Sequence, residues 1–171
     1  MPGATRSQGR EGPTALAWLK RPWTDGDLHG RLLSSGRWSR LVRENLEVIK
    51  QVFNYARTGQ RDRVPELWSD DIVLHYGGDN PISGTYRGKA EVGDAYRRMA
   101  ELSAGTFGVV ELHDILGSED HVVVLARVGA ERAGHRLEWG GIDIYHVSDG
   151  RIQEIWIHVT DQYAVDAFLN R

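Results

Sequence analysis

Residues 121–161 read HVVVLARVGAERAGHRLEWGGIDIYHVSDGRIQEIWIHVTD and predict three consecutive antiparallel strands. The first strand, residues 121–130, is rich in β-branched residues and ends at the polar turn of residues 131–134. The second, residues 135–147, leads through Asp149-Gly150, a strong two-residue hairpin signal, into the third, residues 151–160. Because turn length sets the register of a hairpin, each side chain can be assigned to one face of the sheet.

The two turns predict that Ile144 pairs with Ile155, that Arg127 pairs with Glu138, and that Glu138 also lies opposite Asp161. One face is then apolar and is the predicted buried face, with Val123, Leu125, Ile142, Ile144, Ile155, Ile157 and Val159. Arg127, Glu138 and Asp161 stand side by side at one end of it. Three ionisable groups above an apolar floor predict a functional site, with Leu125 and Ile142 in its lining.

The predicted chemistry of this site is proton transfer. Two carboxylates facing a dry cavity cannot both ionise cheaply, so the pKa of one rises toward neutrality. Arg127 then holds the other as an anion, and the pair can donate and accept a proton. The structural alternative is a salt bridge at the rim of the sheet, with Asp161 capping the terminal helix.

The opposite face of the same strands is polar and aromatic, with Trp139, Asp143, Tyr145, Glu154, Trp156 and His158. Exposed tryptophans on a sheet need a cover, so we expect a homodimer partner or the N-terminal arm to lie there. A His158–Asp143 pair beside Trp139 is the alternative site. The site would lie on this face if a β-bulge reverses the faces of the last strand and turns this face toward the interior.

Helical patterns precede the strands. Residues 39–58 carry apolar residues at spacings of three and four, residues 62–68 form a short helix, and residues 88–103 form a third. Between them, residues 70–77 alternate as a strand that points Tyr76 inward, where its hydroxyl could bond a substrate oxygen. Tyr55 and Trp68 flank the helix ends as core or ligand contacts. The predicted class is α+β, a cone-shaped curved antiparallel meander with three helices on its concave face.

The chain has 171 residues and no cysteine, which suits one domain in a reducing cytoplasm. We expect a basic, Trp-containing N-terminal extension, 1–38, and a domain at 39–171; a non-native leader is the alternative for the extension. The basic residues are too dispersed for nucleic-acid binding, and no apolar run is long enough for a membrane span. The histidine spacing matches no metal motif and no phosphate loop is present, so we expect neither a metal nor another cofactor.

Two stretches carry a family resemblance: DDIVLHYGGDNPISGTYRGKAEV at 70–92 and DGRIQEIWIHVTDQYAVDAF at 149–168. They resemble the SnoaL-like branch of the nuclear-transport-factor-2-like superfamily over residues 44–170. This implies a cone fold that hosts polyketide cyclases, ketosteroid isomerases, epoxide hydrolases and non-catalytic members. The resemblance implies a cofactor-independent cyclase or isomerase acting on a small, mostly apolar molecule, with Asp161 as acid or base.

Epoxide opening at the same residues is the second implication, because Arg127 and Asp161 match the Arg and closing Asp of limonene-epoxide-hydrolase-like members. Gly129 stands where their other Asp would be, and Glu138 is the replacement carboxylate. A non-catalytic binding or dimerisation module is the third.

Overall fold

The computed structural model describes residues 40–171, and the extension predicted at 1–38 lies outside the described residues. The elements are, in chain order, α1 (Arg40–Arg57), η2 (Arg61–Leu67), β1 (Trp68–Tyr76), β2 (Gly84–Arg87), α2 (Gly88–Leu102), β3 (Gly108–Gly117), β4 (His121–Arg132), β5 (His135–Ser148), β6 (Arg151–Val159) and α3 (Gln162–Leu169). The α+β class is confirmed. Within this described part, none of the helices has the length and apolarity needed to cross a membrane.

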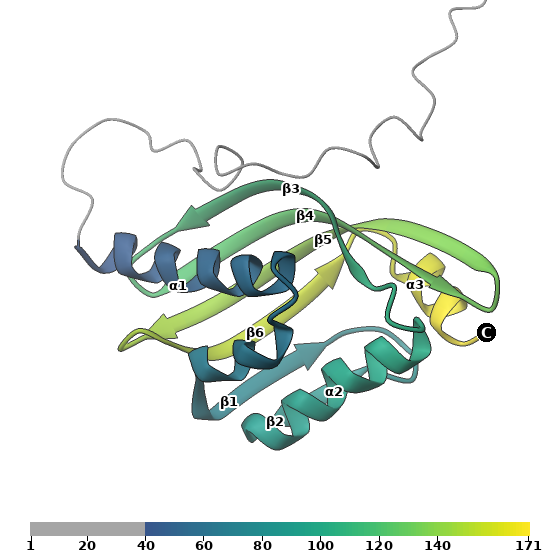
Figure 1. The fold of residues 1–171 in the computed structure, drawn as a ribbon, viewed down its shortest axis with the longest axis horizontal. Helices are drawn as coiled ribbons and strands as arrows, with labels where there is room; N and C mark the ends of the chain where they lie inside the picture. Colours follow the sequence, from purple (N-terminus) through teal and green to yellow (C-terminus); the bar gives the residue numbers. More distant parts are fainter. Residues whose placement is uncertain (1–39) are drawn as a thin grey trace, which may run out of the picture.

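The six strands form one sheet in the order β2-β1-β6-β5-β4-β3. Every neighbouring pair is antiparallel except β1 and β6, which run parallel. The sheet is therefore mixed, which corrects the prediction of a purely antiparallel meander. The connection from β1 to β6 is long enough for a parallel pairing, because α2 and four strands lie between them. In Figure 1 the sheet curves, α1, η2 and α2 cover one face, and α3 lies at one end. We call the covered face concave and the other convex.

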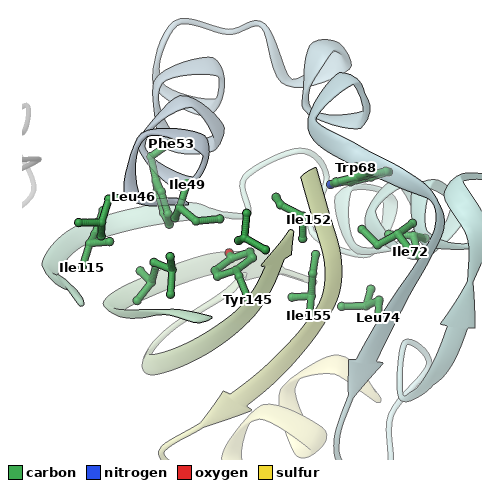
Figure 2. Packing of buried hydrophobic residues seen from close by; sticks show 14 of the residues in the cluster. Leu46, Ile49, Phe53, Trp68, Ile72, Leu74, Ile115, Tyr145, Ile152 and Ile155 are labelled. Atoms are coloured by element: carbon green, nitrogen blue, oxygen red, sulfur yellow. The ribbon is translucent and has the colours of Figure 1, made fainter. Parts of the chain in front are cut away.

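Helix α1 packs on the sheet through one apolar side, as its residue spacing predicts. Leu46, Ile49 and Phe53 are buried, and Figure 2 shows them directed toward the sheet. Asn45, also buried, donates its side-chain amide to the Glu119 carbonyl at 2.7 Å, which ties the helix to the β3–β4 turn. A Cβ on Gly117 would lie 2.9 Å from Leu46, so a glycine permits this close approach.

Two apolar clusters fill the concave side. The first joins α1 to the middle of the sheet and includes Phe53, Trp68, Tyr145 and Ile155 (Figure 2). The second lies beneath α3, with Ile82, Met99, Ala130, Trp139, Val165, Phe168 and Leu169. Burying these side chains removes apolar surface from water, which stabilises the fold by roughly 25 cal/mol per Å².

The β5–β6 hairpin has the predicted two-residue turn but not the predicted register. Asp149 and Gly150 have φ angles of 53° and 70°, and Ser148 pairs with Arg151. The next pairs are Val147 with Ile152 and His146 with Glu154, so Gln153 is an extra residue in β6. This β-bulge pairs Ile144 with Trp156, and the prediction that Ile144 pairs with Ile155 is wrong.

The β4–β5 turn is shorter than predicted. Only Ala133 and Gly134 form it, both with positive φ, and Arg132 pairs with His135. Arg127 therefore pairs with Gly140 rather than with Glu138. Because side chains alternate along a strand, a shift of two residues does not change which side chains of β4 and β5 share a face.

The bulge alone decides which side of β4 and β5 is buried. Ile155 lies on the buried side of β6, and the extra residue pairs it with Tyr145 instead of Ile144. The side of β5 that carries Tyr145 and Trp139 is therefore the buried one. Ile142 of β5, predicted to be buried, is 38% exposed on the convex face. The predicted buried face is thus wrong for β4 and β5, and right for β6 at Ile155, which is 1% exposed.

Candidate functional site

Two of the three predicted catalytic residues lie on the convex face. The Arg127 guanidinium donates to Glu138 at 2.6 Å and to Glu111 at 2.9 Å, and Arg136 also donates to Glu138 at 2.9 Å. All four side chains are partly exposed to solvent. The group is a network of ion pairs on the outer surface, which contributes little net energy because water solvates both charges.

Asp161, the third predicted catalytic residue, is the N-cap of α3. Its carboxylate accepts the Ala164 backbone N–H at 3.0 Å, which satisfies a donor that the first helical turn leaves free. The predicted convergence of Arg127, Glu138 and Asp161 above a buried floor is therefore not observed. Instead, the structure has the alternative arrangement of a salt bridge and a helix cap.

The predicted substrate-binding residues divide between the two faces. Leu125 and Ile142 are convex and pair with each other. Tyr55 is buried on α1 with the Arg63 guanidinium 4.5 Å from its ring centre, which is a structural contact. Trp68 and Tyr76 belong to β1 and contribute to the two concave clusters. Only these last two lie on the side where a cone-shaped sheet could hold a ligand.

Asp143 of β5 places a carboxyl group on the concave side of the sheet, between β4 and β6. Its neighbours on the flanking strands are apolar, because Asp143 pairs with Val124 of β4 and with Ile157 of β6. Burial raises the pKa of Asp143 to about 7. The Tyr145 hydroxyl opposes that rise in pKa by donating to the Asp143 carboxyl oxygen at 3.3 Å.

Three tyrosines surround Asp143. Burial raises the pKa of Tyr76, Tyr96 and Tyr145, and the charge of the nearby Asp143 carboxyl raises each further. These phenols therefore keep their protons at neutral pH and act as neutral hydrogen-bond donors. Tyr96 of α2 stacks on Trp68, with ring centres 5.9 Å apart. We call Tyr76, Tyr96, Asp143 and Tyr145 the concave cluster.

The concave cluster is reachable from solvent. Tyr96 is 36% exposed, and Asp143 and Tyr76 are half-buried, whereas Tyr145 is buried among core side chains. A carboxyl group that is desolvated and still accessible can exchange its proton with a bound molecule. With a pKa of about 7, Asp143 is present in both protonation states at neutral pH. The arrangement can therefore take a proton from a ligand and return it.

The predicted alternative site is divided by the bulge. Asp143 and Trp139 are concave, but His158 is exposed on the convex face, so the predicted His158–Asp143 pair does not form. Trp139 is buried between Phe107 and Phe168, with both ring-centre distances at 6.2 Å, and is a core residue.

Tyr96 was missed as a site residue, because its spacing on α2 is also that of an ordinary core position. Among residues 40–171, no three His, Asp or Glu side chains gather in a way that could hold a metal ion.

Comparison with known proteins identifies the family. The model of the SnoaL-like domain matches residues 49–155, which include β1, β2, α2, β3–β5 and the start of β6. The chain belongs to the SnoaL-like domain family.

Solved structures agree with this family assignment. Bal32a, from a soil-derived mobile gene cassette, is 27% identical, with a TM-score of 0.71 over 76% of this chain and 99% of that chain. A Xanthomonas campestris protein of unknown function with a cystatin-like fold is 31% identical, with a TM-score of 0.69 over 74% and 98%. A candidate SnoaL-like polyketide cyclase from Jannaschia sp. CCS1, 18% identical with a TM-score of 0.64 over 80% and 98%, shares the fold.

Proposed function

We propose that this SnoaL-like protein is a cofactor-independent acid/base enzyme for a small, mostly apolar molecule, of the cyclase or isomerase type. Asp143 is the group that transfers the proton, in place of Asp161. The observation that carries the proposal is a desolvated, accessible carboxyl group among tyrosine hydroxyls, with a pKa of about 7. The candidate cyclase among the structural neighbours has the same fold, which supports the reaction class by analogy only.

The proposed reaction begins at a carbon next to a carbonyl group. The Asp143 carboxylate takes a proton from that carbon, and the electron pair moves onto the carbonyl oxygen as an enolate. Tyr76 and Tyr96 donate hydrogen bonds to this oxygen, which stabilises the charge as it develops. In a cyclase, the enolate carbon attacks a second carbonyl carbon, and the alkoxide that forms takes the proton back from Asp143. In an isomerase, the enolate is conjugated with a carbon–carbon double bond and takes the proton back from Asp143 at the far carbon.

The experiment is turnover of a panel of steroid enones and linear aromatic polyketide mimics by the full chain and its Asp143→Asn variant. We expect kcat to fall about 100-fold or more, because general-base catalysis contributes that much, while KM changes little. Glu138→Gln, which changes a carboxylate on the convex face, is the matched control. A kcat equal to that of the control would remove Asp143 from the mechanism.

A non-catalytic small-molecule-binding module is the second candidate, and one observation favours it. Tyr145, which holds Asp143, is itself buried in the first apolar cluster, so part of this polar group is structural. Calorimetric titration with the same panel distinguishes the two, because a module binds a ligand without turnover by either variant. Epoxide opening at Arg127, Glu138 and Asp161 is not carried forward, because those residues do not meet on the concave side.

We also propose that two copies associate through the part of the convex face that β3, β4 and β5 form, which leaves the part at β2 and β1 open. The lack of cysteine favours the cytoplasm as the location. Ile142 is 38% exposed and Leu116 50% exposed there, beside the half-buried Val123, Leu125 and Ile144. The Arg127 network borders this apolar strip, as a polar rim borders the core of an interface. Ile142→Lys should give a monomer in light scattering at a concentration where the wild type is a dimer. A wild-type monomer would contradict this.

A further inference from the structure

The convex face holds a second group of chemically suited side chains, at the edge where β2, β1 and β6 meet. His75 of β1 pairs with Thr85 of β2 and with Trp156 of β6. Its Nε2 lies 2.6 Å from a Glu154 carboxylate oxygen, and its Nδ1 lies 3.2 Å from the Thr85 hydroxyl. The three polar groups therefore form a continuous chain from carboxylate to imidazole to hydroxyl.

The bond partners assign the histidine tautomer. A carboxylate can only accept, so Nε2–H donates to Glu154 and Nδ1 is left as the acceptor for the Thr85 O–H. The Trp156 ring stacks on the imidazole at 5.7 Å between centres and 9° between planes, which fixes the ring orientation. Nucleophile, base and orienting acid are thus in the order and at the distances that acyl transfer needs.

A surface hollow of about 320 Å³ lies against the hydrogen-bonded side chains of His75 and Thr85. His75, Thr85, Trp156 and His158 contribute to its walls, and so do the residues Gly77 and Gly84, which leave space because they have no side chain. The volume suits a molecule of about one aromatic ring, at the small end of ligand sites. The His75 and Glu154 side chains remain 33% and 31% exposed, so a molecule in the hollow can reach them.

We propose that this hollow is a second active site, which hydrolyses small aryl esters with Thr85 as nucleophile and His75 as general base. The indole of Trp156 contacts the aryl group. His158, which also contributes to the wall of the hollow, donates a hydrogen bond to the ester carbonyl oxygen. Glu154 is a positioning residue that holds His75 in the required tautomer.

The proposed step conserves atoms and charge. The Thr85 oxygen bonds to the ester carbonyl carbon while Nδ1 of His75 takes the hydroxyl proton. The bond from that carbon to the aryl oxygen then breaks, and the phenol leaves with the proton from His75. Water attacks the acyl-Thr85 ester with His75 again as base, which releases the carboxylic acid and restores the hydroxyl.

The hollow shares one residue with the concave cluster, Tyr76, which also contributes to its wall. None of the three residues that carry the proposed ester hydrolysis belongs to that cluster, so the test distinguishes the two sites. The probe is p-nitrophenyl acetate, with the full chain in stopped flow and with peptide mapping after acid quench. We expect a burst of nitrophenol release and an acetyl group on Thr85. Asp143→Asn should leave both unchanged.

The variants isolate each role. Thr85→Val keeps the side-chain shape in the edge strand and should abolish the burst, and His75→Asn should lower the rate about 100-fold. His113→Asn, an exposed histidine on β3, is the matched control and should behave as wild type. Glu154→Gln should lower kcat about 10-fold and leave KM unchanged, which separates positioning from binding.

Unfolding temperatures of all variants establish that a lost burst is not a lost fold. If Thr85→Val and His75→Asn hydrolyse the ester at the rate of His113→Asn, or if the acetyl group maps to another residue, the proposal is overturned.

Discussion

The two faces of the sheet differ in the surroundings of their ionisable side chains. The concave face holds the carboxyl group of Asp143, whose pairing neighbours are apolar and whose polar neighbours are neutral phenols. The convex face holds many charges, and those of Arg127, Glu138 and Glu111 are paired with one another in contact with water. A paired and solvated carboxylate has partners for its charge, whereas burial away from a cation raises the pKa of a carboxyl group until it can donate and accept a proton at neutral pH.

Ile155→Asp should have the largest effect on this contrast. Ile155 is 1% exposed on the concave side of β6, so an aspartate there places a carboxyl group among apolar side chains. Burying such a group without a partner costs several kcal/mol, enough to unfold a marginally stable domain. We expect loss of the cooperative thermal transition in near-UV circular dichroism. Ile142→Asp, at a side chain that is 38% exposed on the convex face, is the control and should remain folded, and a folded Ile155→Asp variant would contradict the assignment of the two faces.

Asp143→Asn should stabilise the protein in a pH-dependent way. The folded-state pKa of Asp143 is about 7 and its ordinary value is 3.8, so the folded state holds a proton that the unfolded chain releases. Below a pH of about 4, Asp143 is protonated in both states and does not lower the free energy of unfolding. As the pH rises to about 7 that free energy falls, and it stays low at higher pH. We expect the variant to be about 2 kcal/mol more stable than wild type at alkaline pH, after allowance for solvent reaching the carboxyl group.

Urea unfolding at several pH values measures this difference. The gain should vanish at acidic pH, where both states of the wild type are protonated. Glu138→Gln provides the comparison from the convex face and should show no such gain. A variant that is less stable than wild type at every pH would mean that the Tyr145 hydrogen bond outweighs the cost of burying the charge.

Arg127→Ala should have the smallest effect. Its partners are partly exposed, so removing the guanidinium should cost at most about 1 kcal/mol, and the loss should shrink in high salt. Thermal unfolding in low and high salt checks this, with Arg97→Ala on α2 as an exposed control. A loss above about 3 kcal/mol would mean that the network behaves as a buried ion pair.

Sequence alone predicted the elements of the fold well and the faces of the sheet poorly. The helix at Leu46, Ile49 and Phe53 and the Asp149-Gly150 turn follow from local spacing and turn chemistry. The bulge at Gln153 has no clear local signal, because no glycine or proline marks it. The one irregularity in the sequence is that Ile152 and Ile155 are three residues apart, whereas residues on one face of a regular strand are two or four apart. Which face of the sheet is buried depends on where α1 and α2 pack, and this tertiary packing cannot be read from the strands alone.

The same limit explains the site. The residues of the concave side, Trp139, Asp143 and Tyr145, were recognised as sharing one face of their strand, but that face was assigned outward. Tyr96 could not be distinguished from a core residue on α2, since its contact with Trp68 joins elements distant in sequence. The ion pair of Arg127 and Glu138 forms as a diagonal neighbour contact although the two residues do not pair directly.

The central claim is that Asp143 is desolvated on the concave side of the sheet. The most direct test is nuclear magnetic resonance titration of the side-chain carboxyl carbons, with the Asp143 signal assigned by comparison with Asp143→Asn. The structure leads us to expect a pKa of about 7 for this group. A midpoint near the ordinary aspartate value of 3.8 would mean that Asp143 faces water, and would contradict the account.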